Sequence, residues 1–300
     1  MKSCFDVIVI GSGPAGMSAC IYLLRAGISC LLIDKEAPGG NLNKSFRVEN
    51  YPGYVEHSGP DLAFKMYSQL EELGLNVKIE EVISVEKENT FKIITNKGKY
   101  ESEYLIISSG RTAKKLLAEN AKNFEGRGIS YCAVCDGSLY KDRKVVIVGG
   151  GNTAAETAIY LSNIAKEITI INRSNELKCT DFEKEELLTI KNLIIKNGVV
   201  VEKVIDENNN IVAVSLSDDT KVKADGIFVC IGQALNDGFY HTLKLNTTSK
   251  GIIVNELMET SEKKVYACGD VIDKKLYQIV TATSEGAIAA TSIINKLKRS

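Results

Sequence analysis

Short apolar runs rich in β-branched residues recur along the chain, and glycine or polar residues bound each of them. Such runs are typical of buried strands, whereas longer stretches with apolar residues on every side are typical of buried helices. In the first part of the chain the pattern predicts strands over residues 5–10, 29–33, 77–85, 91–95 and 104–108, and helices over 17–26 and 61–73.

The second part of the chain continues this alternation. The pattern predicts strands over residues 144–148, 167–171, 193–204, 211–217, 226–230 and 264–267, and helices over 155–164, 180–190 and 278–297. Strands that alternate with helices are typical of α/β folds with parallel sheets. We therefore expect an α/β protein.

A glycine-rich turn follows the first predicted strand directly. It contains Gly11, Gly13 and Gly16, and Asp34 lies 23 residues after Gly11 at the end of the next strand. In such a unit the first glycine permits a tight turn, the second lets the backbone approach a pyrophosphate, and the third lets helix and strand pack closely. The helix N-terminus faces the phosphates and the carboxylate accepts hydrogen bonds from a ribose. The pattern predicts a dinucleotide site.

A second unit of the same kind begins at residue 144. Its glycine turn spans residues 149–154, and Asn172 lies 23 residues after Gly149. Two copies of one supersecondary unit predict two Rossmann-like nucleotide-binding domains. The chain is expected to pass between them near residue 112 and between residues 232 and 240. We predict one domain formed by residues 1–112 and 237–300, with the other, residues 113–236, inserted in it.

A pair of cysteines lies between the two glycine turns. Cys132 and Cys135 are separated by two residues, and Asp136 follows directly. Cysteines at this spacing can close and reopen a small disulfide ring, and an adjacent carboxyl group can exchange the proton that thiol chemistry needs. The segment predicts a relay of electrons from a nucleotide cofactor to a disulfide. The simpler alternatives are a buried cysteine pair without redox use and a turn or cap role for Asp136.

The composition excludes several classes of function. The net charge is −1, from 37 basic and 38 acidic residues, which indicates no nucleic-acid or membrane partner. No apolar run approaches the roughly 20 residues of a spanning helix, and no signal-peptide pattern opens the chain, so we expect a cytoplasmic protein. Six of the eight cysteines are scattered and only two histidines are present. We therefore expect no zinc site and interpret the six cysteines as core residues.

Taken together, these motifs resemble those of the low-molecular-weight thioredoxin reductases. The most specific part is the dithiol segment just before the second glycine turn. The resemblance covers nearly the whole chain, through residues 11–16, 39–42, 48–53, 132–137, 149–154 and 268–290. It implies FAD on the first and last segments, a smaller inserted domain, thioredoxin as partner, and a homodimer.

The resemblance also implies the site residues. Cys135 would lie nearer the flavin and accept its electrons, and Cys132 would attack the disulfide of thioredoxin, forming a mixed disulfide that Cys135 resolves. Asp136 would be the acid–base partner. The residues expected to contact FAD are Gly11, Gly13, Ala15, Gly16, Asp34, Gly40, Leu42, Asn50, Gly269, Asp270 and Gln278.

One part of the family pattern is missing. Members that use NADPH carry His-Arg-Arg after the second strand of the second unit, and a further Arg, to hold the 2′-phosphate. Here the positions read Asn172-Arg173-Ser174 and Lys178, and Lys does not replace Arg in bidentate pairing with phosphate. NADH is not favoured either, because Asn172 stands where a carboxylate would hold its ribose. This erosion resembles the subgroup that takes electrons from reduced ferredoxin.

Several alternatives remain open. Arg173 and Lys178 could suffice for weak NADPH use, or another donor could serve. Ferredoxins are generally acidic, so a basic docking patch is expected. Residues 141–144 and 274–275 are candidates, although a solvated face is the simpler interpretation. The competing functions are a redox sensor without turnover and a flavin-dependent dithiol oxidase with oxygen as acceptor.

Overall fold

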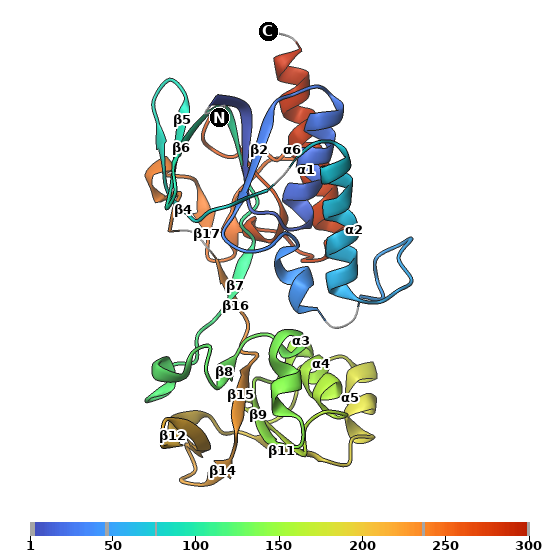
Figure 1. Ribbon diagram of the computed structural model, residues 1–300, viewed down its shortest axis with the longest axis vertical. Coiled ribbons are helices and arrows are strands. Elements are labelled where there is room, and N and C mark those ends of the chain that lie inside the picture. The colour runs from blue at the N-terminus through green and yellow to red at the C-terminus, as the bar shows by residue number, and fades with distance from the viewer. Residues whose placement is uncertain (1–3, 46–47, 76, 236–237, 299–300) are drawn as a thin grey trace. The chain divides into compact units, whose positions relative to one another are not determined.

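The computed structural model describes residues 4–45, 48–75, 77–235 and 238–298. The chain divides into two compact units, one formed by residues 1–112 with 235–300 and the other by residues 113–234. Each unit combines a largely parallel sheet with helices (Figure 1), so the predicted α/β fold class is confirmed. The predicted crossing between residues 236 and 237 lies outside the described residues.

The first unit is built on one mixed sheet with the order β3-β2-β1-β6-β5-β4, to which β19 adds by pairing with β6. The strands are β1 (Cys4–Ile10), β2 (Cys30–Asp34), β3 (Lys78–Ile79), β4 (Val82–Lys87), β5 (Phe91–Thr95), β6 (Lys99–Ile107) and β19 (Val265–Ala267). Ile10 pairs in parallel register with Ile33 and Ile107, and Ala267 pairs with Ile107. The carboxyl ends of four strands therefore meet at one edge of the sheet.

Alternate residues of β1 enter two separate cores. Val7 and Val9 face the helices α1 (Pro14–Arg25), α2 (Gly59–Glu72) and α6 (Ile279–Leu297), while Ile8 and Ile10 face the opposite layer. This is the two-residue period of a strand buried on both faces. The first unit also holds short segments: η1 (Gly40–Lys44), η4 (His241–Leu243), η5 (Gly269–Val271), β17 (Thr247–Thr248) and β18 (Gly251–Ile252).

The second unit repeats this plan on a parallel sheet with the order β11-β10-β9-β15-β8. One face packs against α4 (Asn152–Leu161) and α5 (Asp181–Leu188), and the other packs against a separate three-stranded sheet. The strands of the parallel sheet are β8 (Ile129–Ser130), β9 (Lys144–Val148), β10 (Glu167–Asn172), β11 (Leu193–Asn197) and β15 (Gly226–Val229). Those of the small sheet are β12 (Val201–Glu207), β13 (Asn210–Leu216) and β14 (Lys221–Lys223).

Short elements complete the second unit and its connection to the first. The dithiol segment forms α3 (Ala133–Asp136) and η3 (Gly137–Tyr140), and η2 (Ala121–Phe124) lies shortly before β8. Where the chain leaves and re-enters the first unit, β7 (Arg111–Ala113) pairs with β16 (Gln233–Leu235).

Two predicted strands were wrong in extent. The structure divides each predicted stretch between two separate strands. The stretch 77–85 breaks between β3 and β4 around the buried Glu80, whose carboxylate accepts hydrogen bonds from Thr95 Oγ1 (2.7 Å) and Tyr100 Oη (2.8 Å). The stretch 193–204 breaks at Gly198, which adopts φ +73°. Neither break can be predicted from the apolar pattern, because each depends on local conformation or on contacts with other parts of the chain.

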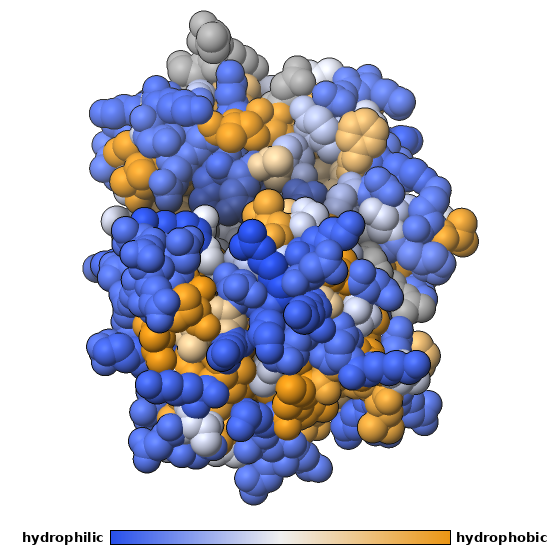
Figure 2. Space-filling model, turned by 60° about the horizontal axis from the view of Figure 1, so that its bottom comes forward, coloured by the Kyte–Doolittle hydropathy of each residue, from blue (hydrophilic) through white to orange (hydrophobic). Residues whose placement is uncertain are grey.

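The surface of the molecule is mixed. On the face drawn in Figure 2, apolar patches alternate with hydrophilic side chains. Within the described parts of the chain, no helix is long and apolar enough to cross a membrane.

Candidate functional site

The first glycine turn has no room for side chains at two of its three glycines. A Cβ atom at Gly11, where φ is +106°, would lie 2.3 Å from the carbonyl oxygen of Ser108, and one at Gly16 would lie 1.9 Å from that of Gly11. Asp34 Oδ2 accepts hydrogen bonds from the Ser12 amide (2.6 Å) and hydroxyl (2.8 Å). The turn is thereby held at the carboxyl edge of the sheet.

Gly13 differs from its neighbours, because a Cβ atom there would meet nothing within 4 Å. It caps α1 without a side-chain hydrogen bond, and the first turn of the helix holds no acidic residue. The amide groups at the start of α1 thus remain available, and such a helix terminus binds phosphate. The open space at Gly13 is what the approach of a pyrophosphate requires.

Two loops bring further predicted residues to this turn. A Cβ atom at Gly40, where φ is +55°, would lie 3.3 Å from Gly13 Cα, and the Gly39 amide donates to the Ser12 carbonyl (2.9 Å). Leu42 is buried in a small apolar cluster behind this loop. Asn50 Nδ2 donates to Gln278 Oε1 (3.0 Å), although 228 residues separate the two.

The segment after β19, near the C-terminal end of the sequence, also lies at this site. Gly269, at φ +79°, lies so close to α1 that a Cβ atom would be 2.9 Å from Ala15 Cβ. Asp270 Oδ1 is buried and has no hydrogen-bond partner among the described residues. An orphaned buried acceptor, an open glycine and a free helix terminus within one unit fit FAD, and all eleven residues predicted to contact it lie in the first unit.

The structure also shows residues that sequence reasoning missed. Lys274 Nζ donates to Glu285 Oε2 (2.9 Å) and lies 3.4 Å from Asp270 Oδ1, and the Lys274 side chain is only 9% exposed. Lys274 was a candidate for a docking patch or a solvated face, and both interpretations are wrong because its ammonium group is buried in this ion pair. The sequence does not indicate that Lys274 is buried, because the neighbouring Lys275 is the same type of residue and is exposed.

Arg111 contacts the same segment. Its Nε donates to the Asp270 carbonyl (2.9 Å), and its guanidinium lies 4.3 Å from the ring centre of Tyr277 and donates to the phenol oxygen (2.9 Å). The Asn41 side chain donates to the Arg111 carbonyl (3.4 Å). The aromatic residue at position 277 thus stacks on a cation that comes from β7.

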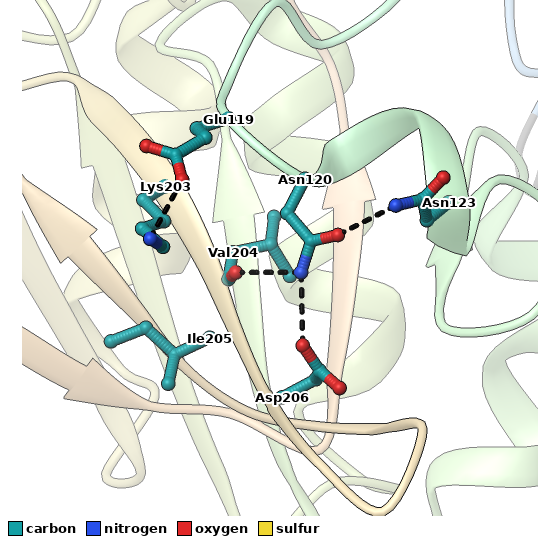
Figure 3. Close-up of a pocket in the computed structure, with 7 residues that line it drawn as sticks. All are labelled: Glu119, Asn120, Asn123, Lys203, Val204, Ile205 and Asp206. Carbon is teal, nitrogen blue, oxygen red and sulfur yellow. Dashed lines mark hydrogen bonds and ion pairs between the residues drawn. The ribbon is translucent and has the colours of Figure 1, made fainter.

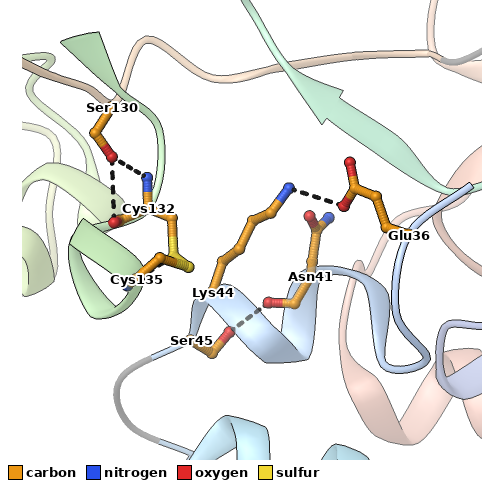
Figure 4. The surroundings of a disulfide bond; sticks show 7 residues. All are labelled: Glu36, Asn41, Lys44, Ser45, Ser130, Cys132 and Cys135. Atoms are coloured by element: carbon orange, nitrogen blue, oxygen red, sulfur yellow. Dashed lines mark hydrogen bonds and ion pairs between the residues drawn. A yellow bond between two sulfur atoms is a disulfide. The ribbon is translucent and has the colours of Figure 1, made fainter. Parts of the chain in front are cut away.

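The two cysteines of the dithiol segment form a disulfide, with Cα atoms 5.4 Å apart. Ser130 Oγ accepts from the Cys132 amide (3.0 Å) and donates to its carbonyl (3.2 Å), which holds the start of α3 (Figure 4). Cys132 is buried and Cys135 is exposed. The pair therefore presents one of its two residues to solvent within its own unit.

Asp136 follows at the end of α3. It is the N-cap residue of η3, but its side chain makes no capping hydrogen bond there. The carboxylate lies near Tyr140, whose pKa is raised first by burial and then by this negative charge. A carboxyl group directly after the disulfide, with no capping hydrogen bond to the described residues of η3, can exchange protons with a thiol.

The second glycine turn has the same geometry as the first but a different partner. A Cβ atom at Gly149 would lie 2.2 Å from the Cys230 carbonyl oxygen, while one at Gly151 would meet nothing within 4 Å. At Gly150 it would lie 2.2 Å from Asn172 Oδ1. The Lys178 amide donates to the Gly150 carbonyl (2.6 Å), so the loop after β10 lies against the turn.

The Asn172 side chain closes that loop on itself. It is buried, and its Nδ2 donates to the carbonyl oxygens of Ser174 (3.0 Å) and Glu176 (2.8 Å) and to Asn197 Oδ1 (2.9 Å). Its Oδ1 accepts from the Ser174 amide (3.2 Å). The amide is fully used within the protein, whereas Arg173 and Lys178 are exposed.

A pocket of about 460 Å³ lies elsewhere in the second unit, beside β12 (Figure 3). Its polar groups already have partners: Asn120 Nδ2 donates to Asp206 Oδ1 (2.9 Å), and Lys203 pairs with Glu119 (2.7 Å). It contains no predicted site residue. No cluster of the described residues could hold a metal ion.

Comparisons with known proteins agree with this geometry. A family model described as "Pyridine nucleotide-disulphide oxidoreductase" matches residues 5–286. The thioredoxin reductase of Bacillus subtilis is 35% identical over 295 residues, covering 96% of this chain and 93% of that protein. The crystal structure of Lactococcus lactis thioredoxin reductase in its FR conformation superposes with a TM-score of 0.92 at 31% identity, covering 99% of this chain and 100% of that one.

A ferredoxin-flavin thioredoxin reductase from Clostridium acetobutylicum is also similar. It is 26% identical, with a TM-score of 0.56 and complete coverage of both chains.

Proposed function

Because the chain belongs to the pyridine nucleotide-disulphide oxidoreductases and, within them, to the low-molecular-weight thioredoxin reductases, it is an FAD-dependent thioredoxin reductase, and we propose that reduced ferredoxin is its electron donor. The loop closed by Asn172 carries the proposal. FAD is assigned to the first unit, and the second unit carries the dithiol on a fold that has lost its nucleotide clamp.

The loop from Asn172 to Lys178 is poorly suited to a 2′-phosphate. It offers two exposed cations, Arg173 and Lys178, and it also carries the exposed carboxylate of Glu176. A charge-assisted hydrogen bond contributes on the order of 1.5–3 kcal/mol. The absence of two such arginine contacts therefore lowers the affinity for NADPH by about 100-fold or more.

The loop is equally unsuited to the ribose of NADH. In the first unit the carboxylate of Asp34 is partly exposed and can only accept hydrogen bonds. In the second unit Asn172 is buried and its Nδ2 donates to groups of its own unit. The position offers no carboxylate, and its amide group is engaged within the loop, so we expect neither nicotinamide cofactor to bind well.

The thiol chemistry belongs to three residues of the second unit. When bound and reduced by the electron donor, FAD would supply a pair of electrons. With two protons, this pair converts the Cys132–Cys135 disulfide to a dithiol. The Cys132 thiolate then attacks the thioredoxin disulfide, and Asp136 supplies the proton to the sulfur that leaves. Cys135 attacks the mixed disulfide at Cys132, which releases reduced thioredoxin and restores the starting disulfide.

An anaerobic experiment tests the donor. Oxidised protein is mixed either with NADPH or with reduced ferredoxin, and the flavin absorbance is followed. We expect bleaching by ferredoxin and none by micromolar NADPH. Rapid bleaching by NADPH would overturn the proposed donor and show that Arg173 and Lys178 suffice.

A variant at Ser174 sharpens this test, because the hydrogen bonds of Ser174 in the loop are made by its backbone. Ser174→Arg restores one cation of the missing clamp and should increase the rate of flavin reduction by NADPH about tenfold or more. Ser174→Ala is the matched control and should change nothing. An equal response of the two variants would mean that the missing cations do not decide the donor.

The dithiol roles have their own test. Cys135→Ser should retain FAD and lose thioredoxin reduction, because the electron pair has no disulfide to enter. Flavin absorbance and a thioredoxin-coupled assay measure the two properties, and Cys230→Ser, a thiol outside the pair, is the control. Normal turnover of Cys135→Ser would exclude the relay. We also propose a homodimer, which light scattering on the purified protein would test.

A further inference from the structure

A buried ion pair lies beside Asp270, whose Oδ1 is buried and accepts no hydrogen bond from the described residues. Lys274 and Glu285 have side chains only 9% and 12% exposed. Lys274 Nζ donates to both oxygens of Glu285 (3.2 and 2.9 Å) and to Thr281 Oγ1 (3.3 Å). Burying such charges is costly unless geometry and additional hydrogen bonds compensate, so a buried pair by itself is weak evidence for stability.

The pair connects the two segments that meet at the cofactor. Glu285 Oε2 accepts a hydrogen bond from the Gly269 amide (2.8 Å), so the carboxylate of α6 holds the first residue of η5. Lys274 follows η5 in the chain and is bound back to α6 through Glu285 and Thr281. The turn at Gly269 and Asp270 is therefore fixed against the helix from both ends.

The pair also controls how Asp270 can be used. Lys274 Nζ lies 3.4 Å from Asp270 Oδ1, yet that oxygen accepts no hydrogen bond. The ammonium group donates to Glu285 and Thr281 instead, so Oδ1 is paired with the charge of Lys274 but can still accept a hydrogen bond. Burial raises the pKa of Glu285, and the Lys274 ammonium opposes this effect. The charge of Glu285 thus depends on its partner.

We propose that Lys274 and Glu285 are positioning residues for the flavin: together they hold the Gly269–Asp270 turn and keep Asp270 Oδ1 free to accept a hydrogen bond from a cofactor hydroxyl. The inference rests on FAD binding in the first unit. Without Lys274, two carboxylates face each other unpaired and the turn is pushed apart. Without the charge of Glu285, Lys274 is free to bind Asp270 and occupies the oxygen that the cofactor needs.

The test measures FAD binding to the apoprotein of Lys274→Met, Glu285→Gln and the double variant by titration. Each single substitution should raise the Kd for FAD about tenfold or more, because a lost or misdirected hydrogen bond to a charged group is of that size. Lys274→Arg keeps the cation and should restore much of the affinity. The pair formed by Lys296, near the end of α6, and Glu259, which lies outside this helix, supplies the controls Lys296→Met and Glu259→Gln, which should bind FAD as the wild type does.

A second readout separates positioning from a merely structural role. The midpoint potential of the bound flavin should rise in Glu285→Gln, which removes a negative charge, and fall in Lys274→Met, which removes a positive one, because reduced flavin is anionic. General loosening of the site would move both potentials in the same direction. Unchanged Kd in both single variants, or shifts of equal sign, would overturn the inference. Failure of the wild type to bind FAD would instead overturn the assignment of the site.

Discussion

One position of the repeated unit carries a carboxylate in the first half of the chain and an amide in the second. Asp34 accepts two hydrogen bonds from Ser12, and Asn172 donates to carbonyl oxygens of its own loop. A carboxylate can only accept, whereas an amide can also donate. The partly exposed acceptor of the first unit is thus replaced in the second unit by a buried amide at the centre of a closed loop.

At Gly13 a side chain is compatible with the fold but is expected to interfere with cofactor binding. An alanine side chain has space there in the protein alone, but it would stand where a pyrophosphate approaches. We expect Gly13→Ala to leave the melting temperature of the apoprotein unchanged and to raise the Kd for FAD at least tenfold. Thermal unfolding measures the melting temperature, and FAD titration measures the Kd. Gly16→Ala, with its 1.9 Å clash, should unfold at a lower temperature; equal behaviour of the two variants would contradict the distinction.

The thiols differ in reactivity because they differ in burial. Cys20 and Cys268 are fully buried, and burial raises the pKa of both thiols. Burial also raises the pKa of Cys230 to about 11. Since the thiolate is the reactive form, reduced native protein treated with iodoacetamide at pH 8 should be labelled at the exposed Cys4 and Cys135, and not at Cys20, Cys230 or Cys268.

Peptide mass spectrometry reads this labelling, and all eight cysteines should react in guanidinium. Labelling of Cys268 in the native protein at the rate seen for Cys4 would contradict the burial of that thiol.

At the scale of elements, the contact between α1 and α6 decides the shape of the flavin site. A Cβ atom at Gly286 would lie 2.1 Å from the Ala15 carbonyl oxygen, so the two helices approach at backbone distance. Gly269 lies against Ala15 as well. The close approach places the start of α6 beside the glycine turn.

Gly286→Ala should force these helices apart. The overpacking should cost about 1–3 kcal/mol of unfolding free energy and weaken FAD binding, because Gln278 and Asp270 move with α6. Denaturant unfolding and FAD titration measure the two effects. Gly98→Ala, where the nearest atom is 3.8 Å away, is the control. Wild-type stability of Gly286→Ala would show that the helices tolerate a wider separation.

The elements that could be predicted are those whose own sequence carries a local signal. The glycine turns, their flanking strands and α1, α4 and α6 have local signals, and the structure places elements there with ends shifted by a few residues. The breaks at Glu80 and Gly198 depend on partners distant in sequence, Thr95 and Tyr100 for the first and Ser174, which accepts from the Gly198 amide, for the second. The hydrophobic periodicity of a segment gives no information on these contacts.

At the scale of the whole molecule, the dithiol and the residues expected at FAD could be named from their motifs, whereas the Lys274–Glu285 pair could not. It joins a segment without regular structure to the second turn of a helix, and both residues are of types usually found exposed. The departure of residues 172–178 from the family pattern was visible in the sequence, but the hydrogen bonds that close the loop were not.

Two units with separate cores should unfold in two steps. FAD binds only the folded first unit, so an excess of FAD at 100 times its Kd should stabilise that unit by about 2.7 kcal/mol and leave the other transition in place. Scanning calorimetry of the apoprotein with and without FAD measures this, and hydrogen exchange assigns each transition to residues. A single transition that shifts as a whole would show that the units unfold together.

The insertion of the second unit between β7 and β16 also orders events during synthesis. Residues 113–234 leave the ribosome while the first sheet still lacks β19 and the apolar face of α1 still lacks α6. The unit that carries the dithiol can therefore fold first, although its residues come from the middle of the chain. Gly269, Asp270 and Gln278 are made last among the residues expected to contact FAD, so we expect the flavin to be acquired only late in synthesis or after it. A chain that ends before residue 269 contains the complete redox dithiol but lacks three of the residues expected to contact the cofactor that serves it.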